Sequence, residues 1–305
     1  MTSDATALIG IDWGTSRRRA HRIDSQGHVL ESRSDALGLF AVRDGNFDVA
    51  LQPLISDWRE TRSIPVLMCG MIGSRNGWAE TAYCECPFGI EDLSRTIAPV
   101  IGAGGTVHIV GGGSATDARR HHDVMRGEET QFFGLDASGR HLAIAPGTHS
   151  KWASLEGERI TEFRTYMTGE LFALLKDHST LGWLMPNRDA TVGDEKSFRE
   201  GIKDAVADND PLHGLFNVRT LGLFDPGRAE GLSSYLSGLL IGCEISSAMT
   251  RYAEKSITVI AAAQLARRYE LALMILGARD VRIADVDAVT AKGLWRIWQA
   301  RGEAL

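Results

Sequence analysis

The residues that decide the fold lie near the N-terminus, in the stretch Leu8-Ile9-Gly10-Ile11-Asp12-Trp13-Gly14-Thr15-Ser16. Its apolar first part predicts a buried strand, and the Gly-Thr-Ser run at its end predicts a turn. Residues 17–23 and 29–32 predict two further strands, joined by a second turn at residues 24–27. The glycine turn therefore leads from one strand to another strand, not into a helix.

This arrangement excludes the two commonest nucleotide-binding loops. A Rossmann dinucleotide site needs G-x-G-x-x-G at the start of a helix, and a Walker P-loop needs G-x-x-x-x-G-K-[ST]. Neither pattern occurs in the sequence. The glycine-rich stretches 102–105 and 111–113 lack the lysine and the hydroxyl that follow a P-loop, so we interpret them as ordinary loops.

A second copy of the opening pattern occurs near the middle of the chain. Residues 141–145 predict a strand, and Pro146-Gly147-Thr148-His149-Ser150 predicts the turn to the next strand. Strands alternate with helical patterns, which is typical of an α/β protein; the clearest helical stretches after the second copy are 170–178, 196–207, 231–252 and 265–276. We therefore expect two similarly built lobes, residues 1–137 and 138–305, divided at the linker-like run Ala137-Ser138-Gly139.

Length and composition agree with two lobes. The chain has 305 residues, of which 44% are hydrophobic and 24% charged, and single hydrophobic cores usually stop growing below this length. Two domains with a ligand cleft between them are the natural expectation. The net charge of −6 gives no general attraction to nucleic acid or to an anionic membrane, so an anionic ligand would need a local positive site.

Cysteine usage and the N-terminus indicate a cytoplasmic protein. The four cysteines, Cys69, Cys84, Cys86 and Cys243, form no C-x-x-C pair, which is typical of reduced thiols in the cytosol. Acidic Asp4 stands where a signal peptide carries positive charge, and no apolar run reaches the length of a membrane span. We expect neither a membrane nor a nucleic acid as partner.

Asp12 and the turn after it could hold a metal ion and phosphates. A carboxylate at a strand end can orient magnesium (Mg2+), while backbone N–H groups and the hydroxyls of Thr15 and Ser16 can donate to phosphate oxygens. Arg17 could add positive charge. Alternatively, Asp12 only starts the turn by accepting hydrogen bonds from nearby backbone N–H groups. The second Gly147-Thr148 turn favours phosphate binding, because two such turns can clamp a nucleotide.

Five blocks of sequence follow one another in a characteristic order: Ile11–Ser16, Met68–Trp78, Val124–Gln131, Ala145–Trp152 and Tyr166–Leu171. Together they resemble the 2-dehydro-3-deoxygalactonokinase family of the sugar kinase, hexokinase and actin superfamily. The resemblance implies an α/β fold of two ribonuclease-H-like lobes with mixed sheets and a nucleotide cleft. It also implies a kinase that uses ATP and Mg2+ to phosphorylate the 6-hydroxyl of 2-dehydro-3-deoxy-D-galactonate in galactonate and galactose catabolism.

The block that starts at Arg126 is similar to the helix start that carries the catalytic Asp in glycerol and pentulose kinases, and Glu128 falls at that Asp. A carboxylate at this place can accept the proton of the substrate hydroxyl during phosphoryl transfer. We expect Glu128 to be this base, with Glu129 and Asp123 as alternatives. A purely structural alternative is that Glu128 and Glu129 stabilise a helix N-terminus through its dipole.

The substrate loop is expected after Cys69, by similarity to the pentulose kinases. Its candidate residues are Met71, Gly73, Ser74, Asn76 and Trp78, although Trp78 and the nearby Tyr83 could equally be packing residues.

The carboxylate of a sugar acid suits the planar guanidinium of an arginine. Arg126 and Arg164 are the candidates, with Arg75 as a third, and each could instead be a structural ion-pair partner.

A run of alanines stands where kinases of this superfamily have a glycine-bearing turn under the adenosine, so we expect Ala262, Ala263 and Gln264 to contact the nucleotide. A turn that needs φ > 0, or a close approach of the backbone to the nucleotide, would make the alanine Cβ atoms crowd the nucleotide, whereas ordinary dihedrals would make them harmless.

Two alternatives for the function remain. One is a kinase of a related sugar acid or ketose, and the other is a sensor on a kinase scaffold that binds a sugar acid without turning over ATP. A homodimer is compatible with either.

Overall fold

The structure is a computed structural model that describes residues 5–59, 64–102, 104–136, 138–186, 194–207, 210–252 and 256–303. Its strands are β1 Thr6–Trp13, β2 Arg18–Asp24, β3 Val29–Asp35, β4 Val66–Cys69, β5 Tyr83–Glu85, β6 Phe88–Gly89, β7 Ala98–Gly102, β8 Gly105–Ile109, β9 Gly112–Thr116, β10 His122–Met125, β11 Arg140–Ala145, β12 Ser150–Glu156, β13 Arg159–Tyr166, β14 Ser256–Ile260 and β15 Asp280–Ala284. Its α-helices are α1 Phe47–Arg59, α2 Ile90–Ser94, α3 Glu128–Phe133, α4 Thr168–His178, α5 Glu195–Ala207, α6 Pro211–Phe224, α7 Leu232–Met249, α8 Ala263–Ile275 and α9 Val286–Glu303. Short 3-10 helices lie at Leu39–Ala41, Arg43–Gly45, Met71–Gly73, Gly182–Leu184 and Pro226–Gly231.

The chain groups into two compact units. The first contains Met1–Arg140, Leu155–Phe163 and Ala284–Leu305, and the second contains His141–Ser154 and Arg164–Ile283. We predicted a division after residue 137, which lies outside the described residues. This division leaves the C-terminal helix α9 in the second lobe. The grouping instead assigns α9 to the first unit, because α9 packs on strands and helices from the first half of the chain. The predicted lobe limits stay a prediction.

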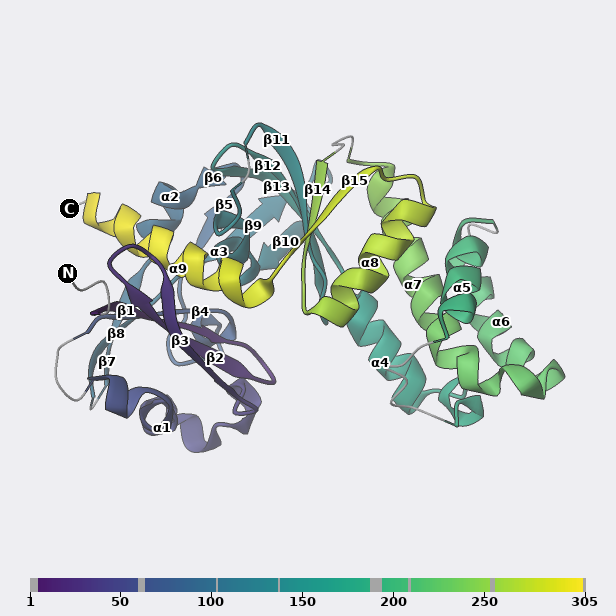
Figure 1. Cartoon of the computed structure of the whole chain (residues 1–305), viewed down its shortest axis with the longest axis horizontal. Coiled ribbons are helices and arrows are strands. Elements are labelled where there is room, and N and C mark those ends of the chain that lie inside the picture. Colours follow the sequence, from purple (N-terminus) through teal and green to yellow (C-terminus); the bar gives the residue numbers. More distant parts are fainter. Residues whose placement is uncertain are drawn as a thin grey trace. The chain divides into compact units, whose positions relative to one another are not determined.

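The first unit is built on a mixed sheet with the strand order β3-β2-β1-β4-β8-β7. Strand β1 pairs with β2 antiparallel and with β4 parallel. Side chains alternate between the two faces of a strand: Ile9, Ile11 and Trp13 pack into one core with α1. On the other face, a Cβ at Gly10 would lie 2.9 Å from Leu294 of α9. Asp12, two residues further on, therefore shares the α9 face, and Figure 1 shows α1 and α9 on opposite sides of this sheet.

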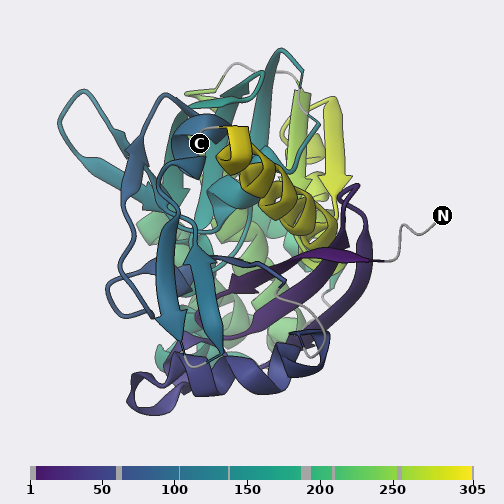
Figure 2. The same ribbon diagram turned by 90° about the vertical axis from the view of Figure 1, so that its left-hand side faces the viewer.

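Helix α9 also braces α3 through two glycines. A Cβ at Gly293 would lie 1.9 Å from the carbonyl oxygen of Thr130, and a Cβ at Gly134 would lie 1.8 Å from the carbonyl oxygen of Val289. The two helices therefore touch backbone to backbone, and α9 runs along α3 and over the purple strands of the sheet (Figure 2). The C-terminal helix thus fixes the short helix whose first residue is Glu128.

The other large sheet repeats the pattern of the first. Its order is β15-β14-β11-β12-β13-β6, so β13-β12-β11-β14-β15 matches β3-β2-β1-β4-β8 in chain order. The central pair is parallel in both copies, β1 with β4 and β11 with β14. In the second unit, Ile144, Trp152 and Val259 pack with residues of α5, α7 and α8 in one core. The duplicated ribonuclease-H-like α/β fold is confirmed.

Two smaller expectations also have an outcome. All four cysteines are free thiols, with Cys69 buried. Within the described ranges, no helix combines the length and the apolar character that a membrane span requires.

Candidate active site

Asp12 lies where three loops of the first unit converge. It is the penultimate residue of β1 and pairs with Cys69, the last residue of β4. Gly70 follows with φ of +90°, and a Cβ there would lie 2.9 Å from Asp12 Oδ1. Gly127 has φ of +114°, and its Cβ would lie 3.1 Å from the Cα of Gly70. Both positions combine a left-handed backbone with a close approach, which favours glycine, and the result is that α3 begins beside Asp12.

The Asp12 carboxyl is buried near one arginine and two other carboxyl groups. Its pKa is raised to about 6, mainly by burial and also by Glu128 and Asp287, whereas Arg19 lowers it. Arg19 Nη1 lies 3.6 Å from Asp12 Oδ2, and Arg19 Nε lies 3.0 Å from Asp287 Oδ1 at the start of α9. One arginine thus partly compensates three acidic groups, and a further cation beside Asp12 would favour the ionised carboxylate.

The first two residues of α3 have different surroundings. Glu129 is fully buried, and both of its carboxyl oxygens accept a hydrogen bond from Gly127 N at 2.8 Å. Burial raises the pKa of Glu129 to about 7, and the neighbouring Glu128 adds to the rise. Glu128 is only half-buried, and its Oε2 accepts a hydrogen bond from Arg126 N at 3.1 Å. Glu128 is therefore the accessible carboxyl group of the pair.

Asp123 is the other residue considered for the base. It lies inside β10, where it pairs with Ala115 of β9. Glu128 raises the pKa of Asp12, whereas Asp123 is not among the charged groups that shift it.

Arg126 is buried one residue before Gly127. Its Nη2 donates to Thr81 O at 3.0 Å and its Nη1 donates to Thr81 Oγ1. The guanidinium lies over the Tyr83 ring, 4.3 Å from the centroid. Its Nε is buried and has no hydrogen-bond partner among the described residues. A buried donor without a partner is costly, so this atom is suited to an anionic ligand.

The predicted substrate loop adds a second donor of this kind. Residues Met71–Gly73 form a short 3-10 helix, and a Cβ at Gly73 would lie 3.0 Å from Arg126 Nη1. The hydroxyl of Ser74, the next residue, is buried without a partner within the described part of the chain. The loop therefore brings Gly73 and Ser74 close to Arg126.

The remaining candidates for substrate binding have other surroundings. Trp78 stacks on Phe47, with ring centroids 6.3 Å apart, and packs against the core of the first unit, as does Met71. Asn76 is exposed. Arg75 is exposed and pairs with Glu80 at 3.6 Å. Arg164 is half-buried on β13, in the second unit. Of the three arginines, Arg126 alone is next to the start of α3.

The first predicted phosphate turn is a four-residue hairpin loop between β1 and β2. Gly14 N donates to Arg17 O at 3.0 Å, which closes the loop. Thr15 is half-buried, whereas Ser16 and Arg17 are exposed. Gly38 approaches so closely that a Cβ there would lie 2.2 Å from Thr15 O. The loop is supported from behind and its hydroxyl-bearing tip remains accessible.

The second predicted turn has the same form in the second unit, between β11 and β12. Gly147 and Thr148 are exposed at its tip. The start of α4 supports it: Glu170 N donates to Thr148 O at 2.9 Å, and a Cβ at Gly169 would lie 2.2 Å from Gly147 O. His149 Nε2 lies 2.5 Å from Glu170 Oε2. The two turns that the sequence predicted are thus both four-residue loops between consecutive strands, each contacted by a glycine of another segment; the second lacks the closing bond of the first, because Pro146 has no N–H.

The alanine turn joins β14 to α8. Ala262 precedes the helix with φ of −60° and ψ of 146°, and the non-glycine residues with positive φ among those described are Asp44 and Arg120. Ala262, Ala263 and Gln264 are exposed. Because the dihedrals are ordinary, the alanines introduce no backbone strain, and the motive for a sensor that has lost its nucleotide falls away.

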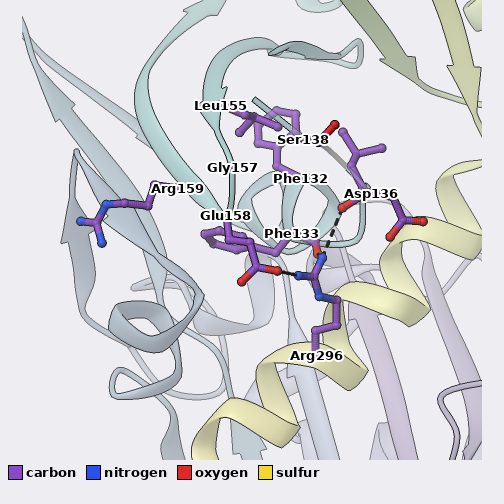
Figure 3. A pocket seen from close by; sticks show the side chains of 10 residues that line it. Phe132, Phe133, Asp136, Ser138, Leu155, Gly157, Glu158, Arg159 and Arg296 are labelled. Carbon is purple, nitrogen blue, oxygen red and sulfur yellow. Dashed lines mark hydrogen bonds and ion pairs between the residues drawn. The ribbon is translucent and has the colours of Figure 1, made fainter. Parts of the chain in front are cut away.

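A separate cavity of about 270 Å³ lies in the first unit, between the end of α3, the β12–β13 turn and α9 (Figure 3). Arg296 crosses it, donating to Phe133 O at 2.8 Å and pairing with Glu158. None of the predicted site residues lines this cavity, so we do not assign it to a reaction.

Two residues of this region were not predicted from the sequence. Arg19 could have been found, since a four-residue loop after Trp13 places it opposite Asp12 in the hairpin. Thr81 carried no signal, because its contact with Arg126 joins segments far apart in the chain.

Comparison with known proteins identifies the family. The family described as 2-keto-3-deoxy-galactonokinase matches residues 12–297. The chain belongs to this family. It is 34% identical over 285 residues to the 2-dehydro-3-deoxygalactonokinase of Escherichia coli (strain K12), with 93% of this chain and 94% of that protein covered. A crystal structure of a Sinorhizobium meliloti protein assigned as a 2-dehydro-3-deoxygalactonokinase superposes with a TM-score of 0.87 at 31% identity, covering 96% of each chain.

More distant structures share the fold alone. Component A of the (R)-2-hydroxyglutaryl-CoA dehydratase of Acidaminococcus fermentans has a TM-score of 0.52 at 10% identity, over 98% of this chain and 99% of that chain.

Proposed function

We propose that the chain transfers the γ-phosphoryl group of ATP to the 6-hydroxyl of 2-dehydro-3-deoxy-D-galactonate, giving 2-dehydro-3-deoxy-6-phospho-D-galactonate and ADP. Membership of the family supports this substrate. The observation that carries the proposal is the convergence of Asp12 and half-buried Glu128 at the contact of Gly70 with Gly127. Phosphoryl transfer needs such positioned charges more than it needs covalent chemistry.

Glu128 is the proposed general base. As the substrate oxygen forms its bond to the γ-phosphorus and the bond from that phosphorus to ADP breaks, the hydroxyl proton passes to the Glu128 carboxylate. Its accessibility supports this role over fully buried Glu129, and its electrostatic interaction with Asp12 supports it over Asp123 in the β9–β10 ladder.

Asp12 is the proposed ligand of Mg2+. Its environment fits a divalent cation: burial, Glu128 and Asp287 raise the pKa of the carboxyl, and Arg19 opposes that rise. Mg2+ is commonly held by one or two carboxylates together with water and phosphate oxygens, so the proposal needs no cluster of further protein ligands. When bound, Mg2+ would neutralise charge on the phosphates.

The two hairpin turns are the proposed phosphate-binding elements. In the first, Gly14, Thr15 and Ser16 offer N–H and hydroxyl donors, and exposed Arg17 adds charge. In the second, Gly147 and Thr148 offer donors from a turn of the same form. Ala262, Ala263 and Gln264, exposed at the start of α8, are the proposed contacts of the adenosine.

Arg126 is the proposed partner of the substrate carboxylate. It is buried beside Gly127 and has an unpartnered Nε within the described part of the chain, whereas Arg75 is exposed. Gly73 and Ser74 lie next to it and are the proposed contacts of the sugar hydroxyls. Met71, Asn76, Trp78 and Arg164 stay predicted substrate contacts with less support, since Trp78 and Met71 pack on the core and Arg164 lies in the second unit.

The cellular setting is proposed from the family. A kinase of this sugar acid would act in the cytoplasm, in galactonate and galactose catabolism, and a homodimer remains compatible with it.

The experiment is a coupled assay of ADP release from ATP and Mg2+ with a panel of sugar acids and ketoses. We expect 2-dehydro-3-deoxy-D-galactonate to react with a higher kcat/KM than its gluconate epimer or any ketose, and phosphorus NMR of the product to show a phosphate ester at C6. A higher kcat/KM for another panel member would assign the alternative substrate. If no panel member is phosphorylated and no ADP is released from ATP, the proposed kinase activity is refuted.

A further inference from the structure

Glu244 of α7 is a buried carboxyl group that the proposed reaction does not use. Its side chain is 3% exposed. Oε1 accepts hydrogen bonds from Ser150 Oγ at 2.6 Å and from Trp152 Nε1 at 2.7 Å, and Oε2 accepts one from Tyr269 OH at 2.7 Å. The Thr168 side chain adds a further hydrogen bond. Four donors from three segments of the second unit, β12, α4 and α8, therefore converge on one carboxyl group.

Two of these donors border the second hairpin turn. Ser150 is the first residue of β12 and directly follows the turn Pro146–His149. Thr168 is the first residue of α4, whose next two residues support the turn from behind: Gly169 contacts Gly147 O, and Glu170 N donates to Thr148 O. Glu244 thus connects the chain after the turn with the helix behind it.

Burying the Glu244 carboxyl group in the core costs free energy. Burial raises the pKa of Glu244, which reflects the free-energy cost of placing a carboxylate in the core, and the hydrogen bonds oppose the rise. Apolar side chains of similar size often pack such a core at no loss of stability. A fully hydrogen-bonded buried network does, however, fix the positions of its members.

We propose that Glu244 is a positioning residue for the nucleotide: it holds Ser150 and Thr168 so that the N–H groups of Gly147 and Thr148 keep the geometry that binds phosphate. The inference rests on the proposed function, since it assumes that this turn contacts the nucleotide. Glu244 itself does not touch the ligand, and it acts through the hairpin and the start of α4.

The test compares two single hydrogen-bond deletions by calorimetric titration with ATP and Mg2+. Ser150→Ala removes the bond on the hairpin side of Glu244. Tyr269→Phe removes the bond on the α8 side and the side-chain contact of Tyr269 with Ser150, but it leaves the bond from Ser150 to Glu244 in place. Loss of one hydrogen bond to a charged group should weaken ATP binding about fivefold to tenfold in Ser150→Ala. The Kd for ATP should stay within about twofold of wild type in Tyr269→Phe, and the KM for the sugar acid should be unchanged in both.

Glu244→Leu is the direct variant. A leucine side chain offers no acceptor to the hydroxyl and indole donors, so it should weaken ATP binding at least as much as Ser150→Ala. If Glu244→Leu does not fold, the pair of single deletions still decides. Equal weakening by Ser150→Ala and Tyr269→Phe, or none by Ser150→Ala, overturns the positioning role while wild-type ATP binding leaves the kinase in place. Absence of ATP binding in the wild type overturns both.

Discussion

Replacing Glu129 with Gln should change how the stability of the protein depends on pH. In the folded chain the pKa of Glu129 is about 7, against a value of 4.5 for the unperturbed group, mainly because the side chain is fully buried. Between these two values the folded state keeps a proton that the unfolded state loses. Stability is therefore greatest below the unfolded pKa and falls as the pH rises towards the folded pKa.

The size of the effect follows from the shift. About 2.5 pKa units at about 1.36 kcal/mol each correspond to about 3 kcal/mol, lost progressively between about pH 4.5 and pH 7. Glutamine does not titrate, and its amide oxygen can still accept the Gly127 N–H bond. Groups such as Asp12 titrate in both chains, so their contribution cancels in the difference between the two free energies of unfolding.

The assay is urea unfolding of wild type and Glu129→Gln, followed by tryptophan fluorescence from pH 5 to pH 8. The wild type should lose about 2 to 3 kcal/mol relative to the variant across this range, with no further change above pH 8. The linkage predicts that the difference between the two free energies of unfolding changes with pH. If that difference instead stays constant within about 0.5 kcal/mol from pH 5 to pH 8, the assignment of a protonated buried Glu129 is refuted.

Three further predictions concern the brace, the metal and the substrate. A methyl group at Gly293 would lie 1.9 Å from Thr130 O, so Gly293→Ala should lower the free energy of unfolding by about 1–3 kcal/mol. The control is Gly302→Ala on the same helix, where a Cβ would have no atom within 4 Å, and it should be neutral or stabilising in the same urea experiment. Equal effects of the two substitutions would contradict the contact between α9 and α3. The pKa of Asp12 is about 6, and protons compete with Mg2+ for the carboxylate. The apparent Kd for Mg2+ should therefore rise about tenfold for each pH unit below pH 6 and become constant above pH 7. An equally steep pH dependence in Asp12→Asn would exclude Asp12 as the ligand. Arg126→Lys should raise the KM for the sugar acid about tenfold or more with the KM for ATP unchanged, since lysine lacks the planar guanidinium, while Arg75→Lys on the exposed loop should leave both values unchanged; the reverse pattern would move the carboxylate contact to Arg75.

The sequence was most informative where the structure is local. The apolar run before Asp12 and the Gly-Thr-Ser turn predicted the β1–β2 hairpin, because alternating apolar residues and turn residues act over a few positions. The same logic found the β11–β12 hairpin, and the helical stretches predicted at 170–178, 196–207, 231–252 and 265–276 correspond to α4, α5, α7 and α8.

Contacts between distant segments could not be predicted. The brace of α9 on α3 depends on Gly134 and Gly293, whose pairing has no local signature, and so the prediction left α9 in the second lobe. Trp78 stood in a block with a family resemblance, yet its ring packs on Phe47. Likewise, the different burial of Glu128 and Glu129 depends on how α3 is held, which neighbouring residues in a sequence do not show.

The central claim is that Asp12 and Glu128 form the site where a sugar acid is phosphorylated. The most direct measurement is steady-state ADP release from ATP, Mg2+ and 2-dehydro-3-deoxy-D-galactonate by wild type, Glu128→Gln and Glu129→Gln in parallel. Loss of a general base predicts a kcat about 10²- to 10⁴-fold lower in Glu128→Gln, with the KM for ATP within about twofold of wild type. Wild-type kcat in Glu128→Gln, with activity lost only in Glu129→Gln, would contradict the assignment and move the base to the buried carboxyl group.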